Sequence, residues 1–184
     1  GITPIINLHH FDLPVELYER YGGWESKKVV ELFVLFAKKC FTLFGDRVKN
    51  WITFNEPMVI VEGEYLYQFH YHNIVDGKKA VQALFNINLA SARAIEAFHA
   101  SACAADDGRI GIVLNLTPAY PRSTQPTDKA AAAFAEDFKN RSFLDPAVKG
   151  EFPETLVKVL QEYCFLWQAT PEELSVIQRN TVDF

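Results

Sequence analysis

The chain has 184 residues, which is enough for one domain with a substantial core, and 49% of them are hydrophobic. Lys and Arg number 18 against 23 Asp and Glu, so the formal net charge is -5 at pH 7, without any basic run. This mild acidity argues against nucleic acid or an anionic membrane surface as the partner, and no apolar run approaches the ~20 residues that cross a bilayer.

The first predicted element is a strand over residues 4–9, P-I-I-N-L-H, whose continuous apolar run is typical of a buried parallel strand. The following residues, H-F-D-L-P, turn out into a loop. His9 and His10 lie at the end of this strand, where successive side chains point to opposite faces. Only one of the two can therefore face a site above the strand, either as a hydrogen-bonded structural residue or as a ligand.

A helix is predicted from Ser26, a suitable N-cap, to Phe44, with apolar residues at helical spacing and Gly45 as its stop. This helix leads into the second predicted strand, residues 51–54, which is β-branched and aromatic. Together with the first strand they form a strand-helix-strand unit, which favours a parallel sheet.

The second strand stops abruptly at Asn55, Glu56 and Pro57. Ligands bind at the carboxyl ends of parallel strands, so a carboxyl group beside an amide there is a candidate acid with a substrate hydrogen-bonding partner. An ordinary solvated turn is the alternative interpretation, because these residue types are common in loops. Pro57 is expected to restrict Glu56 to extended conformations.

The segment after Pro57 is rich in aromatic residues and has weak periodicity, so no regular element is predicted there. His70 and His72 are two apart, and without a nearby Asp, Glu or Cys in a ligand pattern they are expected to line a loop instead of binding a metal. A long, Ala-rich helix is predicted from Gly77 to about Asp106, and Gly108 ends it.

A third buried strand, R-I-G-I-V-L-N, brings the amide of Asn115 to a strand end. A helix is predicted from Thr127, with Asp145 as a terminating or capping residue beyond it, and two short helices follow Pro153 and Pro171. The order of strands and helices predicts a parallel α/β sheet.

Three widely spaced cysteines, Cys40, Cys103 and Cys164, form no C-x-x-C pair. Isolated cysteines in apolar helical contexts predict buried, reduced thiols and a cytoplasmic protein without disulfide or metal roles. The sequence has no signal peptide, and because it begins at Gly1 without an initiator Met, its true start is expected to lie upstream.

Four strings in this order resemble glycoside hydrolase family 1, the β-glucosidase family: L-H-H-F-D-L-P, T-F-N-E-P, G-I-V-L-N-L-T-P and F-L-D-P. T-F-N-E-P is similar to the acid/base signature of that family. The resemblance implies an eight-stranded (β/α) barrel, a TIM barrel, of well over ~400 residues. Residues 1–184 would then be a single incomplete barrel segment, with strands three to five and, at N-T-V-D-F, the start of strand six.

The resemblance implies that Glu56 is the general acid/base of a retaining glycosidase. Asn55 would hold the sugar 2-hydroxyl and His10 another hydroxyl. The aromatic position after His10 is often Trp in the family, and Phe11 here keeps an apolar wall but lacks the indole donor. The nucleophilic carboxylate would come from a late strand that this sequence lacks.

Two further residues are implied on the leaving-group side. Met58 stands where the family often has Trp, and its flexible side chain would accept varied leaving groups. Asn115 is either a structural amide or a contact to the leaving-group subsite. The resemblance implies no metal and no other cofactor.

The string H-H-F-D-L-P and the Tyr-rich loop after T-F-N-E-P look most like members that hydrolyse 6-phospho-β-glucosides. The expected partner is therefore a small-molecule glycoside. A non-catalytic sugar-binding or interaction module is the alternative if 184 residues is the natural length. As an isolated piece of a barrel, the chain is expected to be inactive and to self-associate through its open strand edges.

Overall fold

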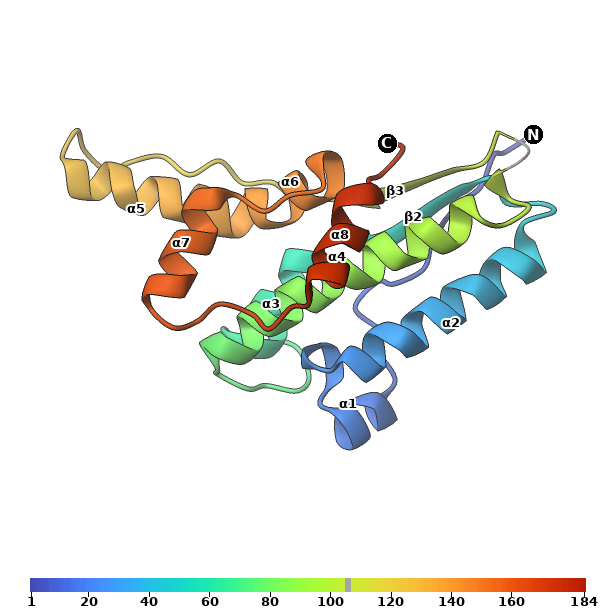
Figure 1. The fold of residues 1–184 in the computed structure, drawn as a ribbon, viewed down its shortest axis with the longest axis horizontal. Helices are drawn as coiled ribbons and strands as arrows, with labels where there is room; N and C mark the ends of the chain where they lie inside the picture. The colour runs from blue at the N-terminus through green and yellow to red at the C-terminus, as the bar shows by residue number, and fades with distance from the viewer. Residues whose placement is uncertain (105–106) are drawn as a thin grey trace.

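The structure, a computed structural model, describes residues 1–104 and 107–184 (Figure 1). Three strands, β1 (Ile5–Asn7), β2 (Asn50–Asn55) and β3 (Arg109–Val113), form one sheet in the order β1-β2-β3. Both strand pairs are parallel, so the predicted parallel α/β sheet is confirmed. Helices lie between and after the strands, which gives the sheet its crossover connections.

The sheet is buried at its centre and open at its first edge. The four middle residues of β2 are buried, as expected for the central strand. In β1, Ile5 is 60% exposed, so the prediction of a buried first strand is wrong. Among the described residues β1 pairs only with β2, which leaves its other edge without a neighbour. Backbone bonds from Leu8 N to Ile52 O and from Asn55 N to His9 O continue the ladder to the end of the predicted strand.

Helices make up most of the described chain. The helix predicted from Ser26 is confirmed, because the Ser26 hydroxyl accepts a hydrogen bond from Lys28 N and the helix ends at Phe44. The described helices are α1 (Val15–Tyr21), the 3₁₀ turn η1 (Gly23–Glu25), α2 (Lys27–Phe44), α3 (Pro57–Tyr65), α4 (Gly77–His99), α5 (Pro126–Glu136), the π-helix η3 (Asp137–Arg141), α6 (Ser142–Lys149), α7 (Glu154–Glu162) and α8 (Pro171–Arg179).

Helices α1 and α3 were not predicted. Helix α3 is buried on nearly all sides, so it lacks the one-sided apolar stripe by which a surface helix is recognised. Helix α1 carries ordinary helix signals, with Glu16 in its first turn and Gly22 at φ 84° as its left-handed C-cap.

Helix α4 forms the centre of the core and packs against α2, α3 and α8. It ends at His99, so the predicted end near Asp106 is wrong, although residues 105–106 lie outside the described part. Its buried polar side chains are satisfied. Ser91 Oγ lies 2.8 Å from Thr53 Oγ1 of β2, and Asn88 Nδ2 donates to the carbonyls of Leu84 and Ser142.

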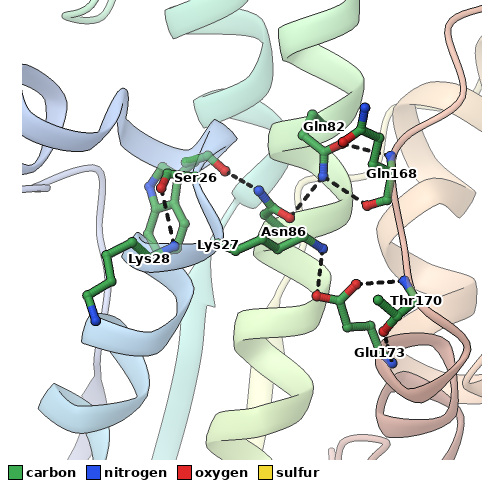
Figure 2. A network of polar contacts seen from close by, with 9 residues as sticks. Ser26, Lys27, Lys28, Gln82, Asn86, Gln168, Thr170 and Glu173 are labelled. Atoms are coloured by element: carbon green, nitrogen blue, oxygen red, sulfur yellow. Dashed lines mark hydrogen bonds and ion pairs between the residues drawn. The ribbon is translucent and has the colours of Figure 1, made fainter.

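A polar network joins the start of α2, the middle of α4 and the segment before α8 (Figure 2). Lys27 Nζ lies 2.9 Å from Glu173 Oε1, and Gln82 of α4 both donates to Gln168 O and accepts from Gln168 N. Thr170 caps α8 in a reciprocal capping box with Glu173. The network therefore connects the start of α2 and the middle of α4 with the start of α8 and the segment before it, which are far apart in the sequence.

The last part of the chain returns to the sheet. The prediction that Asp145 caps or terminates a helix is wrong, because this residue lies inside α6. Its side chain is buried and pairs with Arg141 at 2.7 Å and with Lys149 at 3.1 Å. No strand is formed at N-T-V-D-F. Asp183 N nevertheless donates to Ile110 O of β3, so the chain end runs along the open side of that strand.

The three cysteines are free and differ in exposure. Cys103 is buried and Cys40 half-buried, but Cys164 is exposed, so the prediction of buried thiols is wrong for Cys164. Within the described residues, no helix is both long and apolar enough to span a membrane.

Candidate active site

The predicted site residues gather where the three strands end. His9 and His10 follow β1, Asn55 and Glu56 end β2, and Asn115 follows β3. Because the strands are parallel, their carboxyl ends meet at one edge of the sheet.

The two histidines point to opposite sides, as predicted. His9 is buried, with ring centroids 5.2 Å from both Trp24 and Phe54, and burial lowers its pKa to about 4. His9 is therefore a neutral core residue near pH 7. His10 is exposed, and its ring contacts Asn55 at the end of β2.

His10 and Asn55 are in direct contact. Asn55 Nδ2 lies 3.2 Å from His10 Nε2, within hydrogen-bond distance. The Asn55 backbone N–H also donates to His9 O at 3.0 Å, which holds the end of β2 next to the segment that follows β1. One imidazole and one amide are thus placed side by side, with hydrogen-bonding groups suited to neighbouring hydroxyls.

Glu56 adopts a left-handed backbone conformation, with φ 46° and ψ 58°. The expectation of an extended Glu56 is therefore wrong. The strand passes directly into α3 here, and two backbone bonds hold the turn: Glu56 N donates to Val113 O at 2.8 Å, and Glu56 O accepts from Val59 N at 2.9 Å. A non-glycine residue in this region is strained by about 1–2 kcal/mol, which the surrounding structure must offset.

The Glu56 side chain lines a small cleft of about 60 Å³ together with Met58 and Asn115. Asn115 Nδ2 donates to Glu56 Oε2 at 3.4 Å, a long bond that still directs the amide at the carboxyl group. Asn115 therefore lines the cleft, and its contact with a leaving group stays a prediction. Met58 is buried and contributes an apolar wall next to the carboxyl group.

Phe11 forms a side wall next to His10. Its backbone is also left-handed, with φ 70°, and its ring lies 4.8 Å from that of His10 and 5.2 Å from that of His70. His70 and His72 lie in the loop after α3, as predicted. Within residues 1–104 and 107–184, no group of three or more His, Cys, Asp or Glu side chains could hold a metal ion.

Residues that the sequence did not indicate complete the cleft. Lys139 and Asn140 come from the π-helix η3, Glu62 from α3 and Thr117 from the segment after β3. A π-helix displaces the residues after it relative to a regular helix and is often found at functional sites. The local sequence D-F-K-N-R contains no signal that would have predicted it.

Comparison with known proteins gives a consistent result. The family model described as Glycosyl hydrolase family 1 matches residues 1–184. The 6-phospho-beta-glucosidase GmuD of Bacillus subtilis is 52% identical over 183 residues, covering 100% of this chain and 38% of that protein. Beta-glucosidase A of Thermotoga maritima is 37% identical over 185 residues, covering 100% of this chain and 40% of its own length.

A solved structure agrees. The beta-glucosidase from Exiguobacterium marinum superposes with a TM-score of 0.88 at 32% identity, over 100% of this chain and 41% of that one. The chain thus spans about two fifths of the length of the relatives that it matches. Since the family match covers the whole chain, the chain belongs to glycosyl hydrolase family 1.

Proposed function

We propose that this chain is the central part of a retaining β-glycosidase in which Glu56 is the general acid/base. The observation that carries the proposal is the position of Glu56: it follows the central strand directly, its side chain lines the cleft, and the preceding residue, Asn55, contacts His10. The three strands would be strands three to five of an eight-stranded barrel, and residues 180–184, which form no strand here but bond to β3 through Asp183 N, would lead into strand six.

The residues suggest a sequence of proton transfers. Glu56 would donate its proton to the glycosidic oxygen as the bond from the anomeric carbon to that oxygen breaks and a second carboxylate bonds to the anomeric carbon. In the second half, ionised Glu56 would take a proton from water while water displaces that carboxylate. The second carboxylate would come from outside these residues. Asn55 and His10 would hold hydroxyl groups of the sugar that is transferred.

The proposed substrates are β-glucosides, and among them 6-phospho-β-glucosides. The support is the name and the 52% identity of the Bacillus subtilis relative. A cytoplasmic location is the corresponding proposal, since three free cysteines are typical of a reducing compartment. The alternative of a non-catalytic module is not favoured, because the matched relatives are named as glycosidases.

The test is Glu56→Gln in the full-length protein that carries this chain. On substrates with a poor leaving group, kcat/KM should fall by about 100-fold or more, because the leaving oxygen then needs a proton. On activated aryl glycosides the loss should be much smaller. Equal losses on both substrate types would contradict the acid role, and unchanged activity on both would refute the proposal.

Glu19→Gln is the matched control. Glu19 is an exposed residue of α1 that does not line the cleft, and the exchange removes the same charge. The control should retain the activity of the unaltered protein on both substrate types. An effect of similar size in the control would mean that the assay reports a general change of charge.

A further inference from the structure

An ion pair lies on the wall of the cleft that contains Glu56. Lys139 Nζ of η3 is 3.1 Å from Glu62 Oε1 of α3, and both side chains line the cleft. The Glu62 side chain is 16% exposed and the Lys139 side chain 45%. The ammonium group has three donors, so it can keep its bond to Glu62 and still donate to a ligand.

The position of the cleft relative to Glu56 indicates what it would contact. His10 and Asn55, the proposed sugar-hydroxyl partners, do not line it, whereas Glu56, Met58 and Asn115 do. Under the proposed function, Glu56 protonates the oxygen between the transferred sugar and the leaving group. Because the cleft includes Glu56 but neither of the proposed sugar-hydroxyl partners, we assign it to the leaving-group side.

The chemistry of this wall fits a hydroxylated leaving group. Lys139 and Glu62 offset each other's charge, and Glu56 is a further acid, so the cleft offers no net positive charge to an anion. Met58 and Phe143 supply an apolar floor. A sugar ring has a C–H face for such a floor and hydroxyl groups that pair with an ammonium donor and a carboxylate acceptor.

We propose that Lys139, held by Glu62, selects a sugar as the leaving group. This inference rests on the proposed function and adds the substrate class of its second subsite. The cleft, at about 60 Å³, is smaller than a sugar ring, so it would receive the hydroxyl-bearing edge next to the bond that breaks. Lys139 is then a specificity residue, and Glu62 is the residue that positions it.

The position of Lys139 does not depend on the ion pair alone. The neighbouring Asn140 is buried and clamps the segment after β3, because its Oδ1 accepts from Thr117 N at 3.0 Å and its Nδ2 donates to Thr117 O at 2.9 Å. Asn140 Nδ2 also donates to Glu136 Oε2 at 2.8 Å. An exchange of Lys139 should therefore leave η3 in place.

The experiment uses the full-length protein and two substrates that share the transferred sugar. One has a second glucose as the leaving group and the other has 4-nitrophenol, each offered with and without a 6-phosphate on the transferred sugar. Lys139→Met should lower kcat/KM for the sugar leaving group by about 10- to 100-fold, the range of a hydrogen bond to a charged group. The nitrophenyl substrate should change by less than about 3-fold, because nitrophenol has no hydroxyl groups that require the pair.

Two further variants make the test specific. Lys158→Met, at an exposed Lys of α7 paired with Glu154 at 2.6 Å, removes the same charge and should leave the ratio of the two kcat/KM values unchanged. Lys139→Arg keeps a cationic donor and should restore most of that ratio.

The outcomes separate the two proposals. If the unaltered protein hydrolyses neither substrate, the proposed function fails and this inference fails with it. If it hydrolyses the nitrophenyl substrate but no disaccharide, only the sugar leaving group is refuted. If it hydrolyses both and Lys139→Met lowers both equally or lowers neither, Lys139 has no role in selecting the leaving group.

Discussion

Glu64 should make the stability of this fold depend on pH. Its side chain lies in α3 with 1% exposure, and Tyr18 Oη donates to Glu64 Oε1 at 2.5 Å. Burial raises the pKa of Glu64 to about 8, against the opposing effect of the Tyr18 hydrogen bond. The carboxyl group is therefore neutral in the folded chain at pH 7 and ionised in the unfolded chain.

The sign follows from proton binding. Between the usual pKa of 4.5 and about 8, the folded state holds a proton that the unfolded state has lost, so the free energy of unfolding falls as pH rises. Over this interval of about 3.5 pH units, the free energy of unfolding can fall by at most ~5 kcal/mol, at ~1.4 kcal/mol per unit. Relaxation of the structure around the ionised carboxylate reduces the expected loss to about 2–4 kcal/mol.

His9 acts in the opposite sense. Its pKa is lowered to about 4, so the unfolded state holds the extra proton between pH 4 and 6.5, and the contribution of His9 to stability is lost as pH falls. A pH profile of the free energy of unfolding, measured on the unaltered chain alone, would combine the opposite contributions of Glu64 and His9. The difference between two variants that share His9 isolates Glu64.

The assay is urea unfolding of the chain and of Glu64→Gln from pH 5 to 9, at a concentration where light scattering detects a single species. Gln keeps the size and the acceptor for Tyr18 but cannot ionise. As the pH rises from 5 to 9, the free energy of unfolding of Glu64→Gln should increase by about 2–4 kcal/mol relative to that of the unaltered chain. A difference that does not vary with pH would refute the reasoning, and Glu19→Gln, at an exposed position, should show no such trend.

Three other predictions concern the site and the sheet. In the full-length protein, Asn55→Ala should lower kcat more than it raises KM, because a 2-hydroxyl contact is strongest in the transition state; a change in KM alone would make it ordinary ground-state binding. His10→Ala should impair turnover, whereas His9→Ala should mainly lower the urea midpoint, since His9 is buried between aromatic rings; exchanged effects would contradict this assignment. The isolated chain should lack activity on aryl glycosides and should self-associate in light scattering, because β1 has an open edge with Ile5 60% exposed; a stable monomer at high concentration would count against it.

The sequence predicted the parts of the fold that local patterns determine. The central strand was placed within one residue of β2 at each end, and Ser26 was identified as the cap of α2 because its chemistry is local. The opposite orientations of His9 and His10 followed from the period of a strand.

Tertiary context decided the rest. The left-handed turn at Glu56 depends on a hydrogen bond to Val113 of another strand, which no window around Pro57 contains. Helix α3 is buried on nearly every side and so has no periodic signal. Lys139 and Glu62 are far apart in the sequence, and nothing in the local composition predicts the π-helix that carries Lys139.

The polar network of Figure 2 has a consequence for cleavage of the chain. The segment at residues 120–125 is exposed and joins the larger part, which contains the three strands, to the smaller part, which contains α5 through α8. The Lys27–Glu173 and Gln82–Gln168 contacts cross between these two parts, and α8 packs on α4. A single protease cut in this segment should therefore yield two complementing fragments that elute together on a native column and separate only in denaturant.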